Sequence, residues 1–535
     1  MTNKKNKIKE IYGFLLKNSK QNYTKYELHK KLKIQIETIT SALNVAEDMG
    51  KVKCVQDGKN KTYQALDELK DLIAIAENVE RAKTNQENKR TITSQEREEA
   101  TKSLTLDELT DILGITIKHD NSNKTITFLC MLSAYTNDSQ FNISNRAPSA
   151  TGKSYIPLEL VDMFPKEDAK LIAYSSPTSF FHDTGEWDDT TKSIKIDLSR
   201  KIIIFVDQPH DALLQRLRPL LSHDKRELLY KITDKQEKQG LRTKNVLIIG
   251  FPSVIFCTGS LKMDEQESTR NIVLSPETTQ EKIREALYLK ADKESDPHNY
   301  KQLIADPQRE LLKIRIELIK KENVINVIVP NPEHIADRFM KEQKKLKPRH
   351  TRDLGRVFCF IKALALLNLW QRIRDSDNNI IANDEDVESG FKLYSEISKS
   401  QELGIPPYIY RLYEEIFIPL FKEYPSGITK KQIVSKHFEI YGRPLQDWQL
   451  RQEIMPALEA AALIYEEPDP EDKRRMLIYH TVSLTISSEK NIVSKGVGES
   501  NGKCEMCEMC GEVGSLKKVK DESKQDGFLW ICDKC

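Results

Sequence analysis

The sequence predicts a multidomain protein whose central part is an α/β fold built on a parallel β-sheet. The chain has 535 residues, which is too long for a single hydrophobic core. From about residue 105 to 290, short apolar runs alternate with helical patterns. The runs at 169–174, 201–207 and 252–260 are bounded by turn residues, as buried parallel strands are. Before them, residues 141–145 lead into a loop-forming stretch, "NRAPSATGKSY".

The overall composition does not indicate a binding partner. The 83 Lys and Arg residues nearly balance the 81 Asp and Glu residues, so any surface for nucleic acid must be a local patch. The N-terminus lacks the apolar core of a signal peptide, and no run of 18 apolar residues exists. We therefore expect a cytoplasmic protein with no membrane span.

Both ends of the chain carry a pattern of helices followed by a hairpin. Residues 5–66 indicate three helices, the second capped by Thr24, and then a hairpin at Asp57-Gly58. Residues 429–442, 447–467 and 474–482 repeat this order as two helices and a strand. This order predicts winged helix-turn-helix domains at 1–68 and 401–484, a class that binds either DNA or protein. Polar linkers are expected at 69–104 and 485–503.

The loop at 147–154 has the features of a phosphate-binding loop. Gly152, Lys153 and Ser154 form the end of that motif, and Ala147 stands where its first glycine is usual. Successive backbone N–H groups and a following helix would surround the phosphates of ATP. Lys153 would reach the β- and γ-phosphates, and Ser154 would bind Mg²⁺. The expected nucleotide contacts are Ala147, Pro148, Ser149, Ala150, Thr151, Gly152, Lys153 and Ser154.

A second element of such sites is an apolar strand that ends in an acid. Residues 201–207 supply it, with Asp207 placed to hold Mg²⁺ through water. The next residue is Gln208, where a glutamate usually activates the attacking water. A glutamine can orient water but cannot take its proton, so hydrolysis is expected to be slow or to need another acid such as Asp211.

With this loop and this acid-ended strand, the chain resembles a known family, the AAA+ ATPases of the branch that includes the minichromosome-maintenance and superfamily 3 helicases. Related proteins of this branch occur on mobile elements. The resemblance covers roughly 105–375 and implies an ATPase core at 105–295 and a helical lid at 296–400. Thr258 resembles the sensor 1 residue. The segment "ESTRNIVLSPETTQE" resembles the one with the arginine finger, at Arg270, and "PRHTRDLGRVFCFIKALAL" resembles the sensor 2 helix, with Arg352 at its start.

The same resemblance implies a β-hairpin before sensor 1 that grips DNA in a central channel. The stretches "ELLYKIT" and "RTKNVLIIG" flank a polar turn in the corresponding position. Basic residues at or near the turn would neutralise phosphates without reading sequence. These residues are Lys235, Lys238, Arg242 and Lys244.

The C-terminal tail predicts a zinc site. Five of the nine cysteines lie in the last 32 residues, which favours metal binding in a reducing cytosol over disulfides. Two CxxC pairs, Cys507 with Cys510 and Cys532 with Cys535, are separated by 21 residues and suit a tetrahedral Zn²⁺ site in a ribbon at 504–535. Cys504 also forms a CxxC with Cys507, so the first pair can instead be 504 and 507.

Together these features predict an ATP-driven DNA helicase or translocase. It would act in replication, on the DNA backbone, as a homo-oligomeric and hexameric ring with ATP, Mg²⁺ and Zn²⁺. Two alternatives stay open. One is an ATP-switched DNA-binding initiator or regulator, which slow hydrolysis at Gln208 would suit. The other is an ATP-dependent loader or remodeller of another protein.

Overall fold

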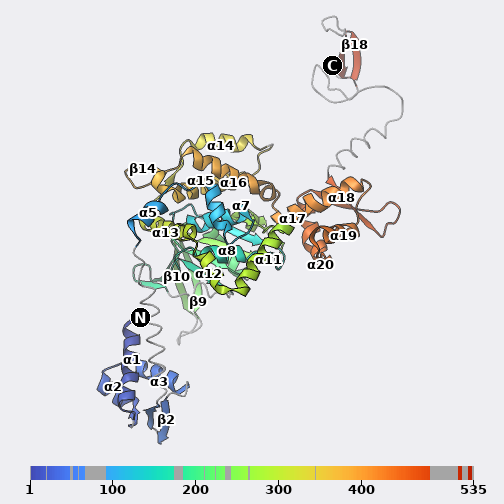
Figure 1. Ribbon diagram of the computed structural model, residues 1–535. Coiled ribbons are helices and arrows are strands. Elements are labelled where there is room, and N and C mark those ends of the chain that lie inside the picture. Colours follow the sequence, from blue (N-terminus) through green and yellow to red (C-terminus); the bar gives the residue numbers. More distant parts are fainter. Residues whose placement is uncertain are drawn as a thin grey trace. The chain divides into compact units, whose positions relative to one another are not determined.

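The fold is given by a computed structural model of the chain (Figure 1). It describes residues 2–19, 21–48, 52–57, 60–66, 92–173, 185–209, 211–222, 225–234, 242–262, 265–343, 345–481, 516–520 and 528–532. The chain divides into two compact units, Met1–Thr93 and Ser94–Cys535, and each is described by itself.

The N-terminal unit has three helices and a small antiparallel sheet, in the order that the sequence predicts. The helices are α1 (Thr2–Lys17), α2 (Lys25–Leu32) and α3 (Ile36–Asp48), and the sheet has the order β1-β3-β2, from Tyr23–Thr24, Asn60–Ala65 and Val52–Asp57. Thr24 caps α2 as expected, because its side chain and that of Glu27 form a reciprocal capping box. Ile11, Leu28 and Tyr63 are fully buried between the helices and the sheet.

A five-stranded parallel sheet forms the centre of the second unit, with strand order β12-β4-β11-β8-β5. Its strands are β4 (Asn142–Arg146), β5 (Ala169–Ile172), β8 (Ile202–Phe205), β11 (Ser253–Thr258) and β12 (Asn271–Leu274). The apolar runs predicted as strands from about residues 169, 201 and 252 thus contain the parallel strands β5, β8 and β11. The short strand β12 lies in the segment for which the sequence predicts only the arginine finger.

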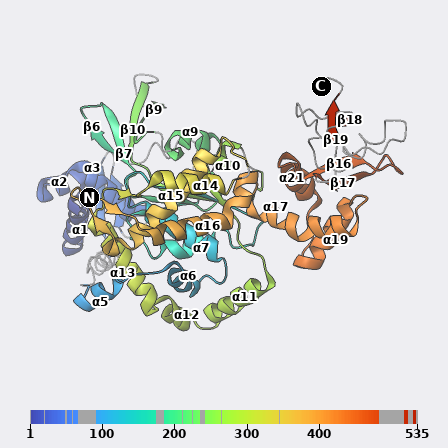
Figure 2. The same cartoon turned by 90° about the horizontal axis from the view of Figure 1, so that it is seen from above.

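Successive residues of the central strands are buried on opposite faces of this sheet. Ile202 and Ile204 belong to one hydrophobic cluster, whereas Ile203 and Phe205 belong to another. Seven helices complete the first cluster, namely α6 (Leu106–Gly114), α7 (Asn121–Ser133), α8 (Tyr155–Val161), α13 (Pro307–Glu322), α14 (Pro332–Lys341), α15 (His350–Leu367) and α16 (Asp384–Leu403). Of these, α7, α15 and α16 lie side by side (Figure 2). It therefore spans both the expected core at 105–295 and the expected lid at 296–400.

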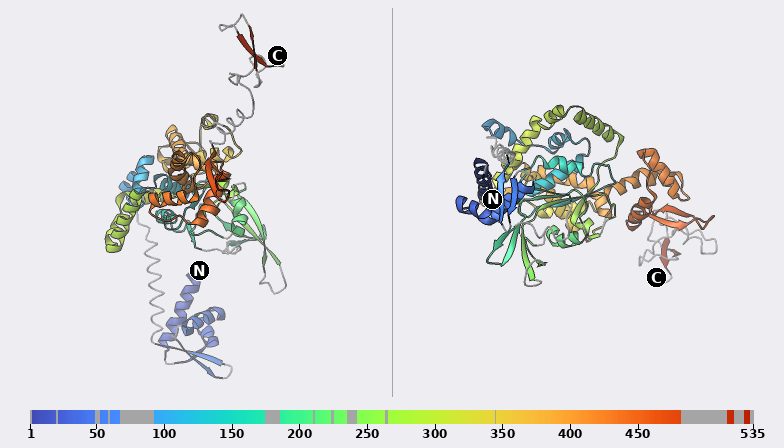
Figure 3. Two further views of the ribbon diagram at one scale, coloured as in Figure 1. Left: turned by 90° about the vertical axis from the view of Figure 1, so that its right-hand side faces the viewer. Right: turned by 90° about the horizontal axis from the view of Figure 1, so that it is seen from below.

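The other face of the sheet carries α9 and a second, four-stranded sheet. Helix α9 (Asp211–Leu221) contributes Leu213 and Leu217 to the second cluster. The second sheet has the order β6-β7-β10-β9, from Glu186–Asp188, Ser193–Asp197, Arg242–Ile249 and Glu227–Asp234. Strands β9 and β10 pair antiparallel, as the sequence predicts, and extend away from the central sheet (Figure 3).

Shorter elements connect these layers. They are α10 (Glu265–Arg270), α11 (Gln280–Ser295), α12 (Pro297–Ile304), the 3₁₀ turn Leu369–Gln371, and a small sheet of β13 (Val327–Ile328), β15 (Ile380–Ile381) and β14 (Ile373–Arg374). Helix α11 buries none of its side chains. Its exposed side chains include Leu287 and Tyr288.

Residues 405–481, here called the C-terminal segment, have their own hydrophobic cluster. It contains α17 (Pro407–Leu412), a π-helical turn Tyr413–Phe417, α18 (Ile418–Glu423), α19 (Lys430–Tyr441), α20 (Asp447–Gln449), a second π-helical turn Leu450–Ile454, α21 (Met455–Ala460), and the antiparallel strands β16 (Ile464–Pro468) and β17 (Met476–His480). The predicted helix at 429–442 is present as α19, and the predicted strand at 474–482 contains β17. The helix predicted at 447–467 ends at Ala460, because Ile464–Pro468 forms β16 and pairs with β17. Further along, β18 (Leu516–Lys520) and β19 (Phe528–Cys532) pair antiparallel.

The sequence-based linker at 69–104 ends too late. Ser94–Ala100 forms helix α5, which packs on α13, and the side chain of Ala100 is buried. The following residues are also held, because the Leu104 N–H donates to Asn368 Oδ1 at 2.9 Å and Arg315 Nη2 donates to the Lys102 carbonyl at 2.7 Å. These contacts join distant parts of the chain, so the local polar pattern gave no sign of them.

Within the ranges described above, no helix combines the length and the apolar character needed to cross a membrane.

Replacing Ile204 in β8 with alanine is expected to destabilise the second unit by about 2–5 kcal/mol, because it opens a cavity beneath the sheet. Ile204 is 0% exposed, whereas Leu171 on the edge strand β5 is 54% exposed and serves as the matched control. Leu171→Ala is expected to change stability by only about 0.5 kcal/mol. Hydrogen exchange of peptides from β8 and β11 in urea measures both variants, and equal destabilisation would contradict this packing.

The C-terminal segment is expected to lose stability as the pH falls below about 6.5, the ordinary pKa of histidine. Burial lowers the pKa of His437 and of His480, so the unfolded chain binds protons there more readily than the folded one. Their stabilising contribution is therefore present above the unfolded pKa and is lost as the pH drops toward the folded value. Hydrogen exchange of residues 430–460 at pH 7.5 and 5.5 measures this loss of stability. His437→Gln should reduce the loss, and an unchanged loss in this variant would refute the role of His437.

Candidate functional site

The parallel pairing of β4, β11 and β8 gathers the predicted site residues at one edge of the sheet. Arg146, the last residue of β4, lies opposite Thr258, the last residue of β11, and Phe256 lies opposite Phe205 of β8. The loop 147–154, Thr258 and Asp207 all follow the carboxyl ends of these neighbouring strands. The chain leaves β4 toward the edge strand β5 and leaves β11 toward the opposite edge strand β12. Such a switch point is where open parallel sheets bind ligands.

The loop 147–154 contains two residues with positive φ angles, of which only one is a glycine. Ala150 has φ +64° and Gly152 has φ +89°. A Cβ at Gly152 would meet no atom within 4 Å, so glycine is required there for its backbone conformation and not for space. Ala147, which replaces the usual first glycine, is fully buried, and its N–H donates to the Thr258 carbonyl at 3.4 Å. Its methyl group is therefore accommodated by packing.

Side chains around the loop fix its position on the sheet. Thr151 Oγ1 donates to the Pro148 carbonyl at 2.8 Å, and Asn145 Nδ2 donates to the Lys153 carbonyl at 3.3 Å. The Tyr155 N–H donates to the Gly152 carbonyl at 3.0 Å, where the loop passes into α8. The backbone of Lys153 is thus held, while its half-buried side chain remains available to a ligand.

Gln208 and Thr258 form a direct pair at the same edge. Thr258 Oγ1 donates to Gln208 Oε1 at 2.6 Å, and the Ser260 N–H donates to Thr258 Oγ1 at 3.1 Å. Asp207 lies beside them, because its Oδ1 accepts the Gln208 N–H at 2.8 Å. Two residues predicted separately, from the acid strand and from sensor 1, therefore act as one unit. The side chain of Asp211 lies outside the described residues.

The thiol of Cys257 reports that Lys153 and Asp207 share this site. Burial raises the pKa of Cys257 to about 12, and two opposing charges modify it, Lys153 lowering the pKa and Asp207 raising it. Cys257 Sγ also lies 3.6 Å from the Lys153 carbonyl. A cation and a carboxylate are thus brought to the same place.

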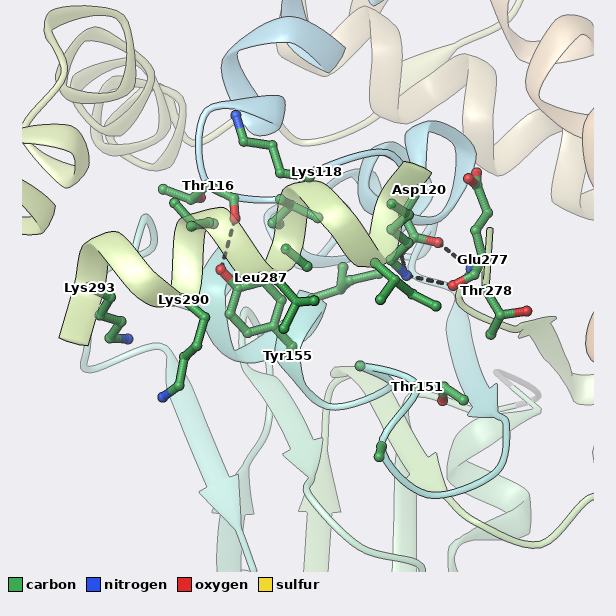
Figure 4. Close-up of a pocket in the computed structure, with 18 of the residues that line it drawn as sticks. Thr116, Lys118, Asp120, Thr151, Tyr155, Glu277, Thr278, Leu287, Lys290 and Lys293 are labelled. Carbon is green, nitrogen blue, oxygen red and sulfur yellow. Dashed lines mark hydrogen bonds and ion pairs between the residues drawn. The ribbon is translucent and has the colours of Figure 1, made fainter. Parts of the chain in front are cut away.

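A cavity of about 650 Å³ adjoins the loop, and the sequence analysis did not find it (Figure 4). Ala150, Thr151 and Gly152 form one side, and Ile283 and Leu287 of α11 form another. This volume lies within the range of cofactor pockets. A signal for it was available in the i, i+4 spacing of Ile283 and Leu287 within the helical segment 280–295.

The charge of the cavity favours an anionic ligand. Five lining residues are basic and two are acidic, namely Lys118, Lys282, Lys290, Lys293, Arg443, Asp120 and Glu277. Asp120 is buried and ion-pairs with Lys282, and it also accepts the Glu277 N–H at 2.7 Å. Lys290 also ion-pairs with Glu294. Once these two pairs are set aside, Lys118, Lys293 and Arg443 outnumber the remaining lining acid, Glu277. Apolar walls beside cations suit a ligand with a flat base and phosphates.

The structure does not bring Arg270 to the loop of its own chain. Arg270 ends α10 immediately before β12, and Asn271 lies opposite Asn142, the first residue of β4. Arg270 is therefore at the amino edge of the sheet, one strand length of roughly 13 Å from the loop. There its Nε donates to Ser222 Oγ at 2.7 Å. If it acts on a phosphate, that phosphate must belong to another subunit.

Arg352 lies beside Arg270 and not beside the loop. Arg352 Nη1 donates to Thr269 Oγ1, next to Arg270 in the chain. Arg356, one turn further along α15, is buried and donates to the carbonyls of Ser268, Thr269 and Asn271 at 3.2, 3.1 and 2.8 Å. Arg356 was not predicted from the sequence, although it follows Arg352 by one helical turn on the same helix.

The predicted DNA-contacting residues are only partly within the described residues. Lys235 and Lys238 lie outside them, and so does the side chain of Arg242, whose backbone begins β10 opposite Asp234. Lys244 on β10 is half-buried and pairs with Ile232 of β9. Lys231 on β9 is exposed, so basic side chains are present along the described part of the hairpin.

The cysteine tail is described only as two paired strands. Cys507, Cys510 and Cys535 lie outside the described residues, and Cys532 is described as the last backbone position of β19. Cys532 lies opposite Leu516, six positions after Cys510. Among the side chains that the structure describes, no group of three or more His, Cys, Asp or Glu residues is placed to hold a metal ion.

Two comparisons with known proteins find no match to this chain. A search against protein-family models gives no match to this chain, and a search of curated proteins gives none either. The function is therefore inferred from the residues and their arrangement.

Proposed function

We propose that the chain is an ATP-dependent DNA helicase or translocase of the AAA+ type that acts as a homo-oligomeric ring. The observation that carries this proposal is the convergence of the loop 147–154, Asp207 and the Gln208–Thr258 pair at one edge of a parallel sheet. The cavity beside the loop adds space for a nucleotide, with apolar walls and basic side chains.

Each of these residues has a role in binding and cleaving ATP. Lys153 would neutralise the β- and γ-phosphates as negative charge moves toward the leaving group. The hydroxyl of Ser154 and the carboxylate of Asp207 are the oxygen ligands that Mg²⁺ prefers, and Mg²⁺ would supply further charge neutralisation. Thr258 holds the Gln208 amide at 2.6 Å, so Gln208 can orient a water molecule. An amide cannot accept the proton of that water, which favours slow hydrolysis.

The position of Arg270 supports shared sites between subunits. Because Arg270 and Arg352 are at the amino edge, they would meet the phosphates bound by a neighbour. Arg356 holds the backbone on both sides of Arg270 and so would fix the arginine in place. A cation supplied in this way typically accelerates phosphoryl transfer by about 10³–10⁵-fold.

The remaining parts fit contact with DNA. The β9–β10 hairpin would present lysine and arginine to the phosphate backbone, which gives binding that depends on salt more than on sequence. The helix-and-hairpin elements at both ends would act as winged helices. The cysteines 507, 510, 532 and 535 would hold Zn²⁺ as a folding clip. Of this set, the structure describes the backbone of Cys532 alone, at the end of β19 opposite Leu516.

A second candidate function is an ATP-switched DNA-binding regulator. The hydrogen bond between Gln208 and Thr258 favours it, since a site that binds ATP and cleaves it slowly suits a switch. A loader or remodeller of another protein is the third candidate.

Replacing Lys153 with alanine is expected to abolish ATP-dependent strand displacement and to lower ATP hydrolysis by at least about 100-fold, because the phosphates lose their cation. Displacement of a labelled strand from a DNA fork measures the first effect. Lys341→Ala is the matched control, since Lys341 is an exposed cation on α14, away from the sheet edge, and should behave as wild type. Wild-type binding of ATP and DNA without displacement or translocation would rule out the helicase and leave the switch.

Replacing Gln208 with glutamate is expected to raise the rate of ATP hydrolysis by about tenfold or more, because a carboxylate can accept the proton of the attacking water. Phosphate release under saturating ATP measures the rate. Gln208→Ala, which also removes the contact with Thr258, should be no faster than wild type. An unchanged rate in Gln208→Glu would mean that another group already acts as the base.

A further inference from the structure

The C-terminal segment contacts the loops that follow β11 and β12. Leu261, three residues after Thr258, is buried within the hydrophobic cluster of the C-terminal segment. Glu453 Oε1 accepts the Leu261 N–H at 3.1 Å and lies 3.4 Å from Ser260 Oγ. Since Ser260 also bonds to Thr258, this contact joins the C-terminal segment to the Gln208–Thr258 pair.

A second contact holds the segment to the loop after β12. Arg411 on α17 donates to the carbonyls of Pro276 and Ser275 at 3.2 and 3.4 Å. Glu277 and Thr278, which follow directly, line the cavity. Two separate anchors therefore hold the C-terminal segment at the carboxyl edge of the sheet, where we propose that nucleotide binds.

The same segment also contributes side chains to the cavity. Tyr441, the last residue of α19, and Arg443 line it together with the loop residues Ala150, Thr151 and Gly152. Gly442 between them has φ +65° and ends the helix, so the chain turns there before Arg443.

Arg443 is half-buried and has only a neutral partner in the part of the chain that the structure describes. Its Nη2 donates to Tyr408 Oη at 3.1 Å, and its guanidinium carbon lies 5.9 Å from the centre of that ring. No described carboxylate is within ion-pair distance of it. A guanidinium that faces a cavity without a counter-charge suits an incoming phosphate, because its planar fork can donate two hydrogen bonds to one anion.

We propose that Arg443 contacts the phosphate groups of the nucleotide bound by its own chain, and that the C-terminal segment thereby responds to whether the site is filled. This rests on the proposed function, since it requires a nucleotide in the cavity beside the loop. The cation comes from the same chain, in contrast to Arg270 and Arg352, which lie at the opposite edge of the sheet. Filling the site then ties the segment to the sheet by a third contact, in addition to Glu453 and Arg411.

The test is a titration of the full chain with a fluorescent ATP analogue and Mg²⁺. Arg443→Ala is expected to weaken binding of the analogue by about tenfold, because it removes a charge-assisted hydrogen bond to the phosphates. Arg443→Lys should recover part of this loss, since it keeps the charge and loses the fork. Lys431→Ala, which removes an exposed cation on the same helix α19, should bind as wild type does.

Lys153→Ala, measured alongside, separates the two proposals. If Lys153→Ala weakens binding and Arg443→Ala does not, the role of Arg443 is refuted while the proposed function stands. If the wild-type chain binds no nucleotide, both are refuted. Equal weakening in Arg443→Ala and Lys431→Ala would also refute the role of Arg443, because it would indicate a general effect of charge.

Hydrogen exchange gives a readout that simple weakening of affinity does not explain. With nucleotide at saturating concentration for each variant, peptides from α19 should exchange several-fold more slowly than without nucleotide in the wild type and in Lys431→Ala. In Arg443→Ala, the same peptides should exchange equally with and without nucleotide. Equal protection of α19 in wild type and Arg443→Ala would overturn the proposed response of the C-terminal segment.

Discussion

The parallel pairing of β4, β11 and β8 is the constraint on which the other features depend. It brings three short segments, far apart in the sequence, to one edge of a sheet, and each carries a different chemical group. The pairing is held by residues such as Ile143, Ile204 and Ile255, which are fully buried and have no part in chemistry. The same pairing puts Arg270 at the opposite edge. One set of backbone hydrogen bonds thus determines which groups meet at one edge and which lie at the other.

Around this edge, the chain places groups that differ in how strongly they are held. Asp120, Asn145 and Arg356 are buried and make several hydrogen bonds, so they fix the backbone around the site. Lys153, on the loop itself, is half-buried, and Lys293 and Arg443 line the cavity and are also less enclosed. Groups that position the site are therefore satisfied within the protein, while several groups that suit a phosphate retain capacity for a ligand. This division is typical of a site that is formed before its ligand arrives.

The strands, the loop and the terminal helix patterns could be predicted from the sequence because each depends on neighbouring residues. Apolar runs and the spacing of Gly152, Lys153 and Ser154 are local signals, as is the capping pair Thr24 and Glu27. The contacts of Arg443, Arg356 and Asp120 could not be predicted, because each joins segments separated by many residues. Helix α5 was not predicted for the same reason, since it is buried by packing against α13, which is distant in the sequence. The zinc ligands and the tip residues Lys235 and Lys238 stay predictions from the sequence.

The central claim is that nucleotide binds between the loop 147–154 and helix α11. Photolabelling with 8-azido-ATP in the presence of Mg²⁺, followed by mass spectrometry of the peptides, tests it most directly. We expect saturable labelling of peptides that line the cavity, from 116–120, 150–156 or 277–300, and loss of the label when unmodified ATP is added in excess. Labelling that ATP does not displace, or labelling confined to peptides away from this cavity, would contradict it.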